Sequence, residues 1–165
     1  MDPFVEACHA LEHAELRYLV VGSFGIALRA RERGLLVVTE DFDILLRPDV
    51  ADLARAVALL RERGFDITAS TEPLMDEDLV VLAGILRARS PIRATRGGWA
   101  LDLLTHAEAL EFDDSWSRQT PFMLQGVEVR VASLEDLILS KRAADRPKDR
   151  VFLEMWREQL EEPGC

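Results

Sequence analysis

Hydrophobic and polar residues alternate with two different periods along this chain, and each period predicts a type of element. Apolar residues recur at helical spacing over residues 4–15, 24–33, 48–63, 133–144 and 148–161. Shorter segments alternate at every second residue or are continuously apolar, which predicts strands. These predicted strands span residues 17–21, 41–46, 65–69, 79–86 and 99–104, with a hairpin formed by 122–125 and 127–131.

Residues that begin or end helices support these boundaries. Asp2 and Pro3 suit a helix start, because Asp can cap the first turn and Pro tolerates the first helical position. Gly34 and Gly64 follow two predicted helices, where Gly adopts the left-handed conformation that ends a helix. The segment 133–136 resembles a capping box, with Asp136 in place of the usual Glu.

The order of the elements predicts an α+β fold. Helices alternate with strands early in the chain and strands cluster later, which favours a mixed β-sheet with helices packed on it. The length of 165 residues suits one domain, 1–165. We expect a sheet region over about 17–132 and a short C-terminal helical segment over 133–162.

Composition narrows the classes of function. Thirty acidic and twenty basic residues give a net charge of −10, which argues against broad binding to nucleic acids. No apolar run is long enough to span a bilayer, and the first residues lack the pattern of a signal peptide, so no membrane contact is expected. The two cysteines, at positions 8 and 165, form neither a disulfide framework nor a zinc motif. We expect a cytoplasmic protein.

A carboxylate motif lies at the head of one predicted strand. Asp41 and Asp43 are two residues apart, so on a strand their side chains point to the same face. Two adjacent carboxylates repel each other and raise each other's pKa, a cost that a divalent cation removes. Mg²⁺ suits this arrangement because it takes one or two protein carboxylates and completes its shell with water and phosphate oxygens.

Two further features accompany the motif. Gly22 and Ser23 follow a predicted strand and open a helix, where backbone N–H groups and the helix dipole attract phosphate. Asp102 lies in an apolar predicted strand and needs a partner, because burial of a lone carboxylate is costly. A neighbouring strand would bring it to the motif as a third metal ligand. A phosphate cradle beside metal-binding carboxylates indicates phosphoryl or nucleotidyl transfer.

These residues resemble the signature of the nucleotidyltransferase superfamily, which has the fold of the DNA polymerase β catalytic domain. The similarity covers Val20 to Ser23, Ala27, Leu28, Gly34, Thr39 and the segment 41–45. The tail over 131–150 is similar to that of small bacterial proteins related to AbiEii-type toxins and aminoglycoside nucleotidyltransferases. The resemblance extends from about residue 17 to residue 160.

The resemblance implies roles for individual residues. Asp41, Asp43 and Asp102 would bind metal, with two Mg²⁺ ions expected, and Asp102 would also be the base toward an acceptor hydroxyl. Gly22, Ser23 and Thr39 would contact the nucleotide, and Lys141 would neutralise phosphate charge. The implied reaction moves a nucleoside monophosphate from an NTP to a hydroxyl of a small molecule, a protein or a tRNA.

Two alternatives follow from the sequence. Relatives often carry a basic residue where this chain has Val37, so the protein is either an enzyme or a catalytically weak fold relative that acts as a binding or toxin–antitoxin component. The basic cluster in the tail is either a solvated helix face or the phosphate side of the cleft. It consists of Lys141, Arg142, Arg146, Lys148 and Arg150.

Three less prominent features are interpreted as structural. His106 either lines the cleft or lies in a surface turn, of which the turn is favoured, and we interpret Glu111, Asp113 and Asp114 as a solvated loop. The tryptophans Trp99, Trp116 and Trp156 are interpreted as core or lid residues rather than base-stacking platforms.

Overall fold

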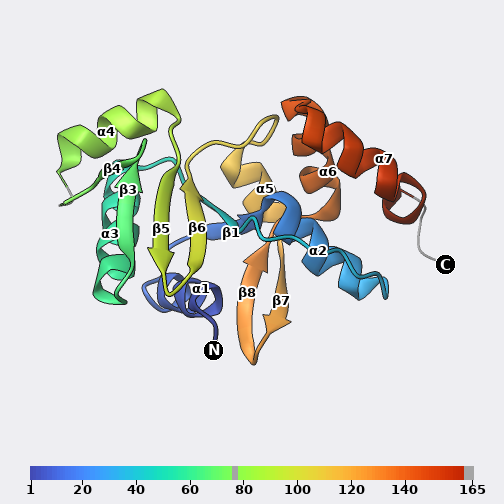
Figure 1. Cartoon of the computed structure of the whole chain (residues 1–165), viewed down its shortest axis with the longest axis horizontal. Helices are drawn as coiled ribbons and strands as arrows, with labels where there is room; N and C mark the ends of the chain where they lie inside the picture. The colour runs from blue at the N-terminus through green and yellow to red at the C-terminus, as the bar shows by residue number, and fades with distance from the viewer. Residues whose placement is uncertain (76–77, 162–165) are drawn as a thin grey trace.

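The structure is a computed structural model that describes residues 1–75 and 78–161 (Figure 1). Over these residues the chain forms seven helices and one eight-stranded sheet. The helices are α1 (Pro3–His13), α2 (Gly22–Glu32), α3 (Val50–Glu62), α4 (Leu79–Ala88), α5 (Phe112–Arg118), α6 (Leu134–Ala144) and α7 (Pro147–Glu161). The strands are β1 (Tyr18–Val21), β2 (Asp43–Leu46), β3 (Asp66–Ala69), β4 (Glu72–Pro73), β5 (Ile92–Arg96), β6 (Trp99–Leu104), β7 (Thr120–Leu124) and β8 (Val127–Val131).

The sheet is mixed, with the strand order β4-β3-β5-β6-β2-β1-β8-β7. β2 runs parallel to β6 and β1 runs parallel to β8, while the other neighbouring strands are antiparallel. An exposed turn at Gly97 and Gly98 joins β5 to β6, and both glycines have the left-handed φ that such a turn requires. The α+β class and the mixed sheet predicted from the sequence are therefore confirmed.

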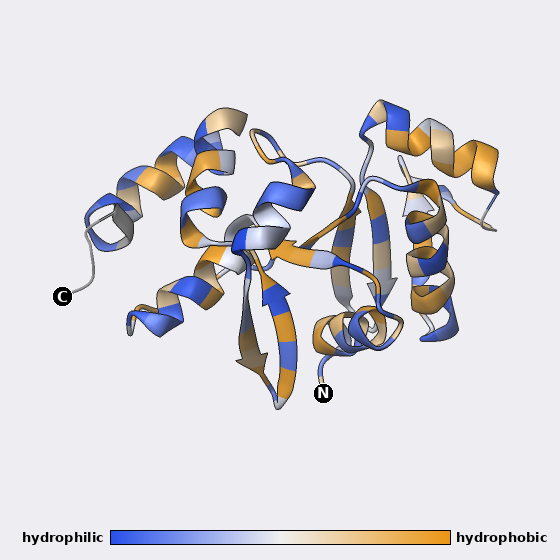
Figure 2. Cartoon of the chain, turned by 180° about the vertical axis from the view of Figure 1, so that it is seen from behind, coloured by the Kyte–Doolittle hydropathy of each residue, from blue (hydrophilic) through white to orange (hydrophobic). Residues whose placement is uncertain are grey.

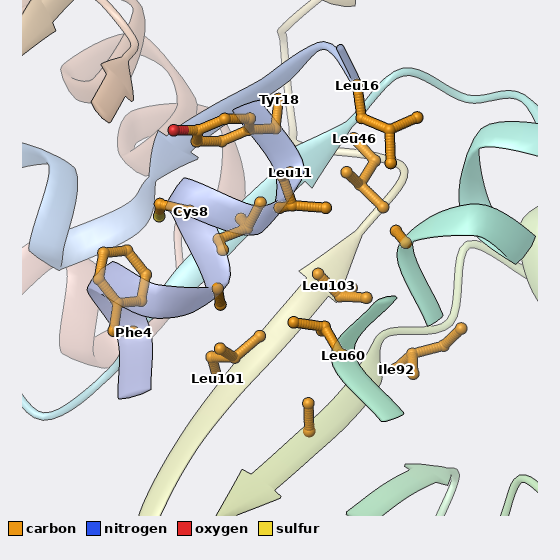
Figure 3. Packing of buried hydrophobic residues seen from close by; sticks show 14 of the residues in the cluster. Phe4, Cys8, Leu11, Leu16, Tyr18, Leu46, Leu60, Ile92, Leu101 and Leu103 are labelled. Carbon is orange, nitrogen blue, oxygen red and sulfur yellow. The ribbon is translucent and has the colours of Figure 1, made fainter. Parts of the chain in front are cut away.

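The two faces of the sheet pack against separate core clusters. Alternate residues of a strand point to opposite faces, and in β1 Tyr18 and Val20 join the first core cluster while Leu19 and Val21 join the second. The first core cluster lies between the sheet and α1 and α3; Figure 3 shows part of it, including Phe4, Cys8, Leu11, Tyr18, Leu46, Leu60, Ile92, Leu101 and Leu103. The second core cluster also contains Ile26, Ala27, Ala30, Val37, Leu45, Phe112, Ala132, Leu134, Leu137 and Ile138.

The helices of the second face cover only part of it. α2 packs against α6, and α6 packs against α7, so these three helices form one group. In Figure 1, α6 and α7 lie together on one side of the molecule, and α3 and α4 lie on the other. Figure 2 shows the alternation of hydrophobic and hydrophilic residues along the β7–β8 hairpin, which extends away from both groups. Strands β5 and β6 are thus left accessible on this face.

A buried arginine fixes α2 against the sheet. Arg29 is 5% exposed, and its guanidinium donates hydrogen bonds to the carbonyl oxygens of Thr120, Val131 and Ala132. Its charge is balanced by Glu32, 2.9 Å away. Burial of a charged group requires such partners, so Arg29 ties α2 firmly to the end of β8.

Three parts of the fold differ from the sequence-based predictions. Residues 79–86, predicted as a strand, belong to helix α4, which Asp78 caps by accepting hydrogen bonds from the backbone N–H groups of Val80 and Val81. A short continuous apolar run has no periodicity that separates a buried strand from a helix. The strands β4 and β5 were not predicted, and Asp113 and Asp114 lie in helix α5 rather than in a loop.

Within the described residues, none of the helices combines the length and the apolar character needed to cross a membrane.

Candidate active site

The turn between β1 and α2 is shaped around a carboxylate. α2 begins at Gly22, directly after β1, and Ser23 lies in its first turn, as predicted. Gly22 has a φ of +65°, and a Cβ atom at this position would lie 2.2 Å from Oδ2 of Asp43. Only a residue without a side chain allows this close approach. The first turn contains no acidic residue, and Val21 at the cap supplies no side-chain hydrogen bond, so the helix start remains suited to an anion.

The strand register brings three charged residues into one row. Asp43 on β2 is the direct neighbour of Asp102 on β6, and Asp102 is the direct neighbour of Arg93 on β5. Directly paired residues of adjacent strands share a face of the sheet. The predicted meeting of Asp43 and Asp102 on neighbouring strands is therefore confirmed, and Arg93 extends the row.

Asp41 lies outside the strand that was predicted to hold it. β2 begins at Asp43, so Asp41 belongs to the preceding loop, and its side chain is 61% exposed. Phe42 points to the other face, where its ring packs against Phe4, Phe24 and Trp99. Asp41 nevertheless lines the same cleft as Asp43. Its Oδ2 lies 3.5 Å from Nζ of Lys148, at the start of α7.

The carboxyl of Asp43 has a raised pKa. Burial raises the pKa of its carboxyl to about 6, and the negative charges of Asp102 and Asp41 act in the same direction. The positive charges of Lys148 and Arg146 offset part of this effect. A raised pKa means that the ionised carboxylate lacks sufficient counter-charge, so Asp43 is a carboxylate that a cation would stabilise.

Asp102 has a partner within the protein. Arg93 donates two hydrogen bonds to it, from Nε to Oδ1 and from Nη2 to Oδ2, both 2.9 Å long. This paired geometry is the strongest form of arginine–carboxylate contact. The partner that the sequence required for Asp102 is thus an arginine on β5, a strand that was not predicted.

The basic cluster of the tail is divided between two places. Lys141 is 6% exposed, and its ammonium lies 2.8 Å from Oδ1 of the fully buried Asp149. Arg146 contacts Oδ2 of Asp149 at 2.6 Å. Burial alone would raise the pKa of Asp149, but the hydrogen bonds from Arg146 and Lys141 outweigh it and hold the pKa below its usual range. Arg142 and Arg150 line a separate groove between α6 and α7.

The role of Lys141 toward phosphate stays a prediction, and the structure adds an acidic partner for it. Lys141 does line the cleft, but Asp149 already balances its charge. Arg146 and Lys148 also line the cleft, and their side chains are 58% and 62% exposed. Arg146 and Lys148 thus lie in the cleft, and whether this part of the basic cluster is the phosphate side stays a prediction.

A cleft of about 640 Å³ joins these groups. It extends from Gly22 and Ser23 at the start of α2, past Asp43 and Asp102, to the end of α4. Further residues that line it are Val21, Glu40, Asp41, Phe42, Arg89, Pro91, Arg93, Ala100, Leu104, His106, Ala107, Glu108, Leu137, Ser140, Lys141, Ala144, Arg146 and Lys148. β6 and β2 lie between β5 and β1. Asp43 and Asp102 therefore lie between the start of α2 at one end of the cleft and the end of α4 at the other.

Two sequence-predicted residues differ from expectation. Thr39 is not among the described residues that line the cleft. Its hydroxyl instead accepts a hydrogen bond from the backbone N–H of Asp41. His106, interpreted as a surface turn residue, lines the cleft, with Nε2 3.3 Å from Glu108 and 3.4 Å from Arg89. Val37 is 4% exposed and packs in the second core cluster, so it does not face the cleft.

Sequence reasoning missed Arg93, Arg89 and the separate role of Arg146. The segment Ile92 to Arg96 alternates apolar and polar residues, a strand pattern that could have identified β5. Its pairing with Asp102 depends on the sheet order, which the sequence does not reveal. Arg146 was recognised as part of the basic cluster, but its contact with Asp149 was not.

Comparisons with known proteins address the fold. No protein-family model matches the sequence, and no curated protein sequence matches it either. Solved structures do resemble it. A proposed nucleotidyltransferase from Thermotoga maritima is 15% identical, with a TM-score of 0.58, over 93% of this chain and 89% of that one.

Two further solved structures are similar to this chain. The lincosamide antibiotic adenylyltransferase LnuA, solved with lincomycin bound, is 15% identical with a TM-score of 0.55, over 89% of each chain. The antibiotic-resistance factor ANT(2'')-Ia is 17% identical with a TM-score of 0.51, over 96% of this chain and 84% of that one. The relation to AbiEii-type toxins stays a prediction. The strand order, the turn at Gly22 and these likenesses together establish that the chain has the fold of the nucleotidyltransferase superfamily.

Proposed function

We propose that the protein is a Mg²⁺-dependent nucleotidyltransferase that moves a nucleoside monophosphate from an NTP to a hydroxyl of a small molecule. One observation carries the proposal. Asp43 and Asp102 stand side by side on β2 and β6, in a cleft that also receives the start of α2. Carboxylates beside a helix N-terminus suit the transfer of a phosphorus-containing group, because one holds metal and the other attracts phosphate.

The carboxylates fit a site for Mg²⁺. Asp43 and Asp41 would hold the metal, with Asp102 as a third ligand, and two ions are proposed. Among residues 1–75 and 78–161, no three Asp, Glu, His or Cys side chains form a ready cage for a metal ion. Mg²⁺ needs fewer protein ligands than such a cage supplies, because water and substrate phosphates complete its shell. The raised pKa of Asp43 supports the choice, because a bound cation would relieve the repulsion.

The phosphates of the nucleotide would occupy the end of the cleft near α2. Backbone N–H groups at Gly22 and Ser23 would donate to them, and the helix dipole would favour their negative charge. Arg146 and Lys148 face the same cleft with exposed cationic groups. Lys141 would act mainly by holding Asp149, which in turn fixes Arg146.

Asp102 would act on the acceptor. Bound Mg²⁺ would stabilise the charge that develops on the transferring phosphoryl group. The acceptor hydroxyl would approach from the β5 side of the cleft and donate its proton to a carboxylate oxygen of Asp102. Its oxygen would bond to the α-phosphorus of the NTP as the bond to pyrophosphate breaks and pyrophosphate leaves. His106 and Arg89 line this side and would contact the acceptor.

The acceptor class is inferred from size, charge and likeness. A cleft of about 640 Å³ suits a small molecule, since ligand sites usually measure roughly 300–1,000 Å³. Two structures with this fold are described as an antibiotic adenylyltransferase and an antibiotic-resistance factor. A tRNA end is the least favoured acceptor, because the net charge of −10 repels a polyanion. A protein side chain remains the alternative acceptor.

The competing hypothesis of a catalytically weak binding or toxin–antitoxin protein loses its main support. It depended on Val37, which occupies a position where relatives often carry a basic residue. Val37 packs in the second core cluster and is not among the described residues that line the cleft.

The decisive experiment supplies each labelled NTP with Mg²⁺ and a panel of hydroxyl-bearing small molecules, proteins and tRNA. We expect a labelled small-molecule product with the wild type and none with Asp43→Asn. Labelled protein or tRNA would replace the acceptor class while keeping the reaction. The proposal fails if no acceptor is labelled and MgNTP does not raise the melting temperature of the wild type.

A further inference from the structure

The row of charges across the sheet ends in an arginine that the proposed chemistry does not use. Arg93, Asp102 and Asp43 are direct neighbours on β5, β6 and β2, and all three line the cleft. Both carboxylate oxygens of Asp102 accept hydrogen bonds from Arg93. The guanidinium of Arg93 therefore already contacts the carboxylate oxygens of Asp102 that a divalent ion would need as ligands.

The contact is well formed but accessible. The side chain of Arg93 is 57% exposed, whereas that of Asp102 is 24% exposed. Arg93 can thus move into solvent without opening the core, and its guanidinium keeps its charge there. A carboxylate has about four lone-pair sites on its two oxygens, so loss of one hydrogen bond leaves room for a metal ligand while the other bond remains.

We infer that Arg93 is a displaceable counter-ion of the metal site, which holds Asp102 before metal binds and releases at least one of its oxygens to the divalent cation. The inference rests on the proposed function, because it takes Asp102 as a metal ligand. Arg93 reduces the repulsion between Asp102 and Asp43 on neighbouring strands before metal binds. Its presence lowers the affinity for metal in return.

The charges in the cleft predict the direction of the effect. Removal of Arg93 leaves two carboxylates side by side with one fewer cation, so a divalent ion gains more by binding. The competing arginine contact is also lost. Because the pair is accessible to water and ions screen it, the change is moderate, a roughly threefold to tenfold tighter affinity for metal.

The test measures metal binding without nucleotide, by calorimetry with Mg²⁺ alone and by the electron paramagnetic resonance of Mn²⁺. Arg93→Gln removes the charge, and Arg93→Lys keeps the charge but loses the paired contact. The matched control is Arg89→Gln, which also removes an arginine from the cleft. The guanidinium of Arg89 contacts His106. We expect the dissociation constant to fall roughly threefold to tenfold for Arg93→Gln, less for Arg93→Lys, and under about twofold for Arg89→Gln.

A second measurement separates this role from a structural one. Without metal, Arg93→Gln should melt at or slightly below the wild-type temperature, and Mg²⁺ should raise its melting temperature by more than it raises that of the wild type. If Arg93 had a role in stability alone, Arg93→Gln would lower the melting temperatures with and without Mg²⁺ by the same amount.

The outcomes separate the inference from the proposed function. Unchanged or weaker binding in Arg93→Gln overturns the inference, as does equal tightening in Arg89→Gln. If Asp43→Asn binds Mg²⁺ as the wild type does, the metal site itself is wrongly assigned and the proposed function fails with it. If Asp43→Asn abolishes binding while Arg93→Gln has no effect, only the role of Arg93 is lost.

Discussion

A methyl group on Gly22 would lie 2.2 Å from Oδ2 of Asp43, so the first residue of α2 and the first residue of β2 are in direct steric contact across the sheet. The backbone at Gly22 also has a φ of +65°. The site thus depends on this glycine for two separate reasons, space and conformation.

Gly22→Ala should lower both stability and activity. The left-handed backbone costs about 1–2 kcal/mol for a residue with a side chain, and the clash with Asp43 adds to this. Gly98→Ala is the matched control, because its φ is +83° but nothing lies within 4 Å of an added Cβ. Urea unfolding should show a larger loss for Gly22→Ala. Equal losses, with nucleotide binding retained, would mean that Asp43 moves aside freely.

Asp43→Asn should separate stability from nucleotide binding. The substitution removes one of several neighbouring negative charges, so the unliganded protein should keep or slightly gain stability. Mg²⁺ prefers anionic oxygens, so the rise in melting temperature with MgATP or MgGTP should disappear. Asp66→Asn, on an exposed position of β3, serves as the control. A much lower melting temperature without nucleotide would instead identify Asp43 as a structural residue.

The raised pKa of Asp43 predicts a pH dependence of stability. The carboxyl is protonated in both states below about pH 4, and above its folded pKa of about 6 the folded protein carries the cost of the buried charge. Asp43 therefore contributes stability at low pH that is lost as the pH rises from about 4 to about 6. The difference between the two pKa values corresponds to at most about 3 kcal/mol.

Melting curves between pH 4 and pH 7.5 test this dependence. Asp43→Asn should match the wild type near pH 4 and exceed its stability near pH 7. Mg²⁺ binding should weaken below pH 6 in the wild type, because the proton competes with the metal. Parallel curves for the two proteins would contradict the assignment.

The cations near α7 should divide into two functional kinds. Asp149→Asn leaves the buried Lys141 without its counter-ion, which should cost about 3–5 kcal/mol of stability. Lys148→Gln removes an exposed charge, so its effect on stability should stay within about 0.5 kcal/mol. Of the two variants, Lys148→Gln alone should weaken MgATP binding without a change in the free energy of unfolding. The division is wrong if Asp149→Asn unfolds like the wild type.

The sequence was most informative where a pattern is local. The turn at Gly22, the helix after it and the acids before Ile44 follow one another closely, and together they form the signature that predicts one site. Asp102 is predicted as a site residue because a carboxylate in an apolar strand requires a partner. Asp41 was placed in β2, but it lies in the loop before it, since the alternation that suggests a strand also fits an irregular segment.

Long-range pairing set the limit. Arg93 contacts Asp102 because β5 lies beside β6, and only the strand order reveals this. The burial of Lys141 depends in the same way on where α7 packs, because α7 places Asp149 in contact with the ammonium of Lys141. The apolar run of α4 was misassigned because its side chains show no period.

The exposed turn at Gly97 and Gly98 falls between the segment that carries Asp43 and the segment that carries Asp102. A break there yields two pieces, 1–97 and 98–165, with one member of the central acid pair in each. Neither piece can complete the site alone, although β2 of one retains the edge to which β6 of the other binds. The turn thus offers a place to divide the protein so that the proposed metal site forms only when the two pieces meet.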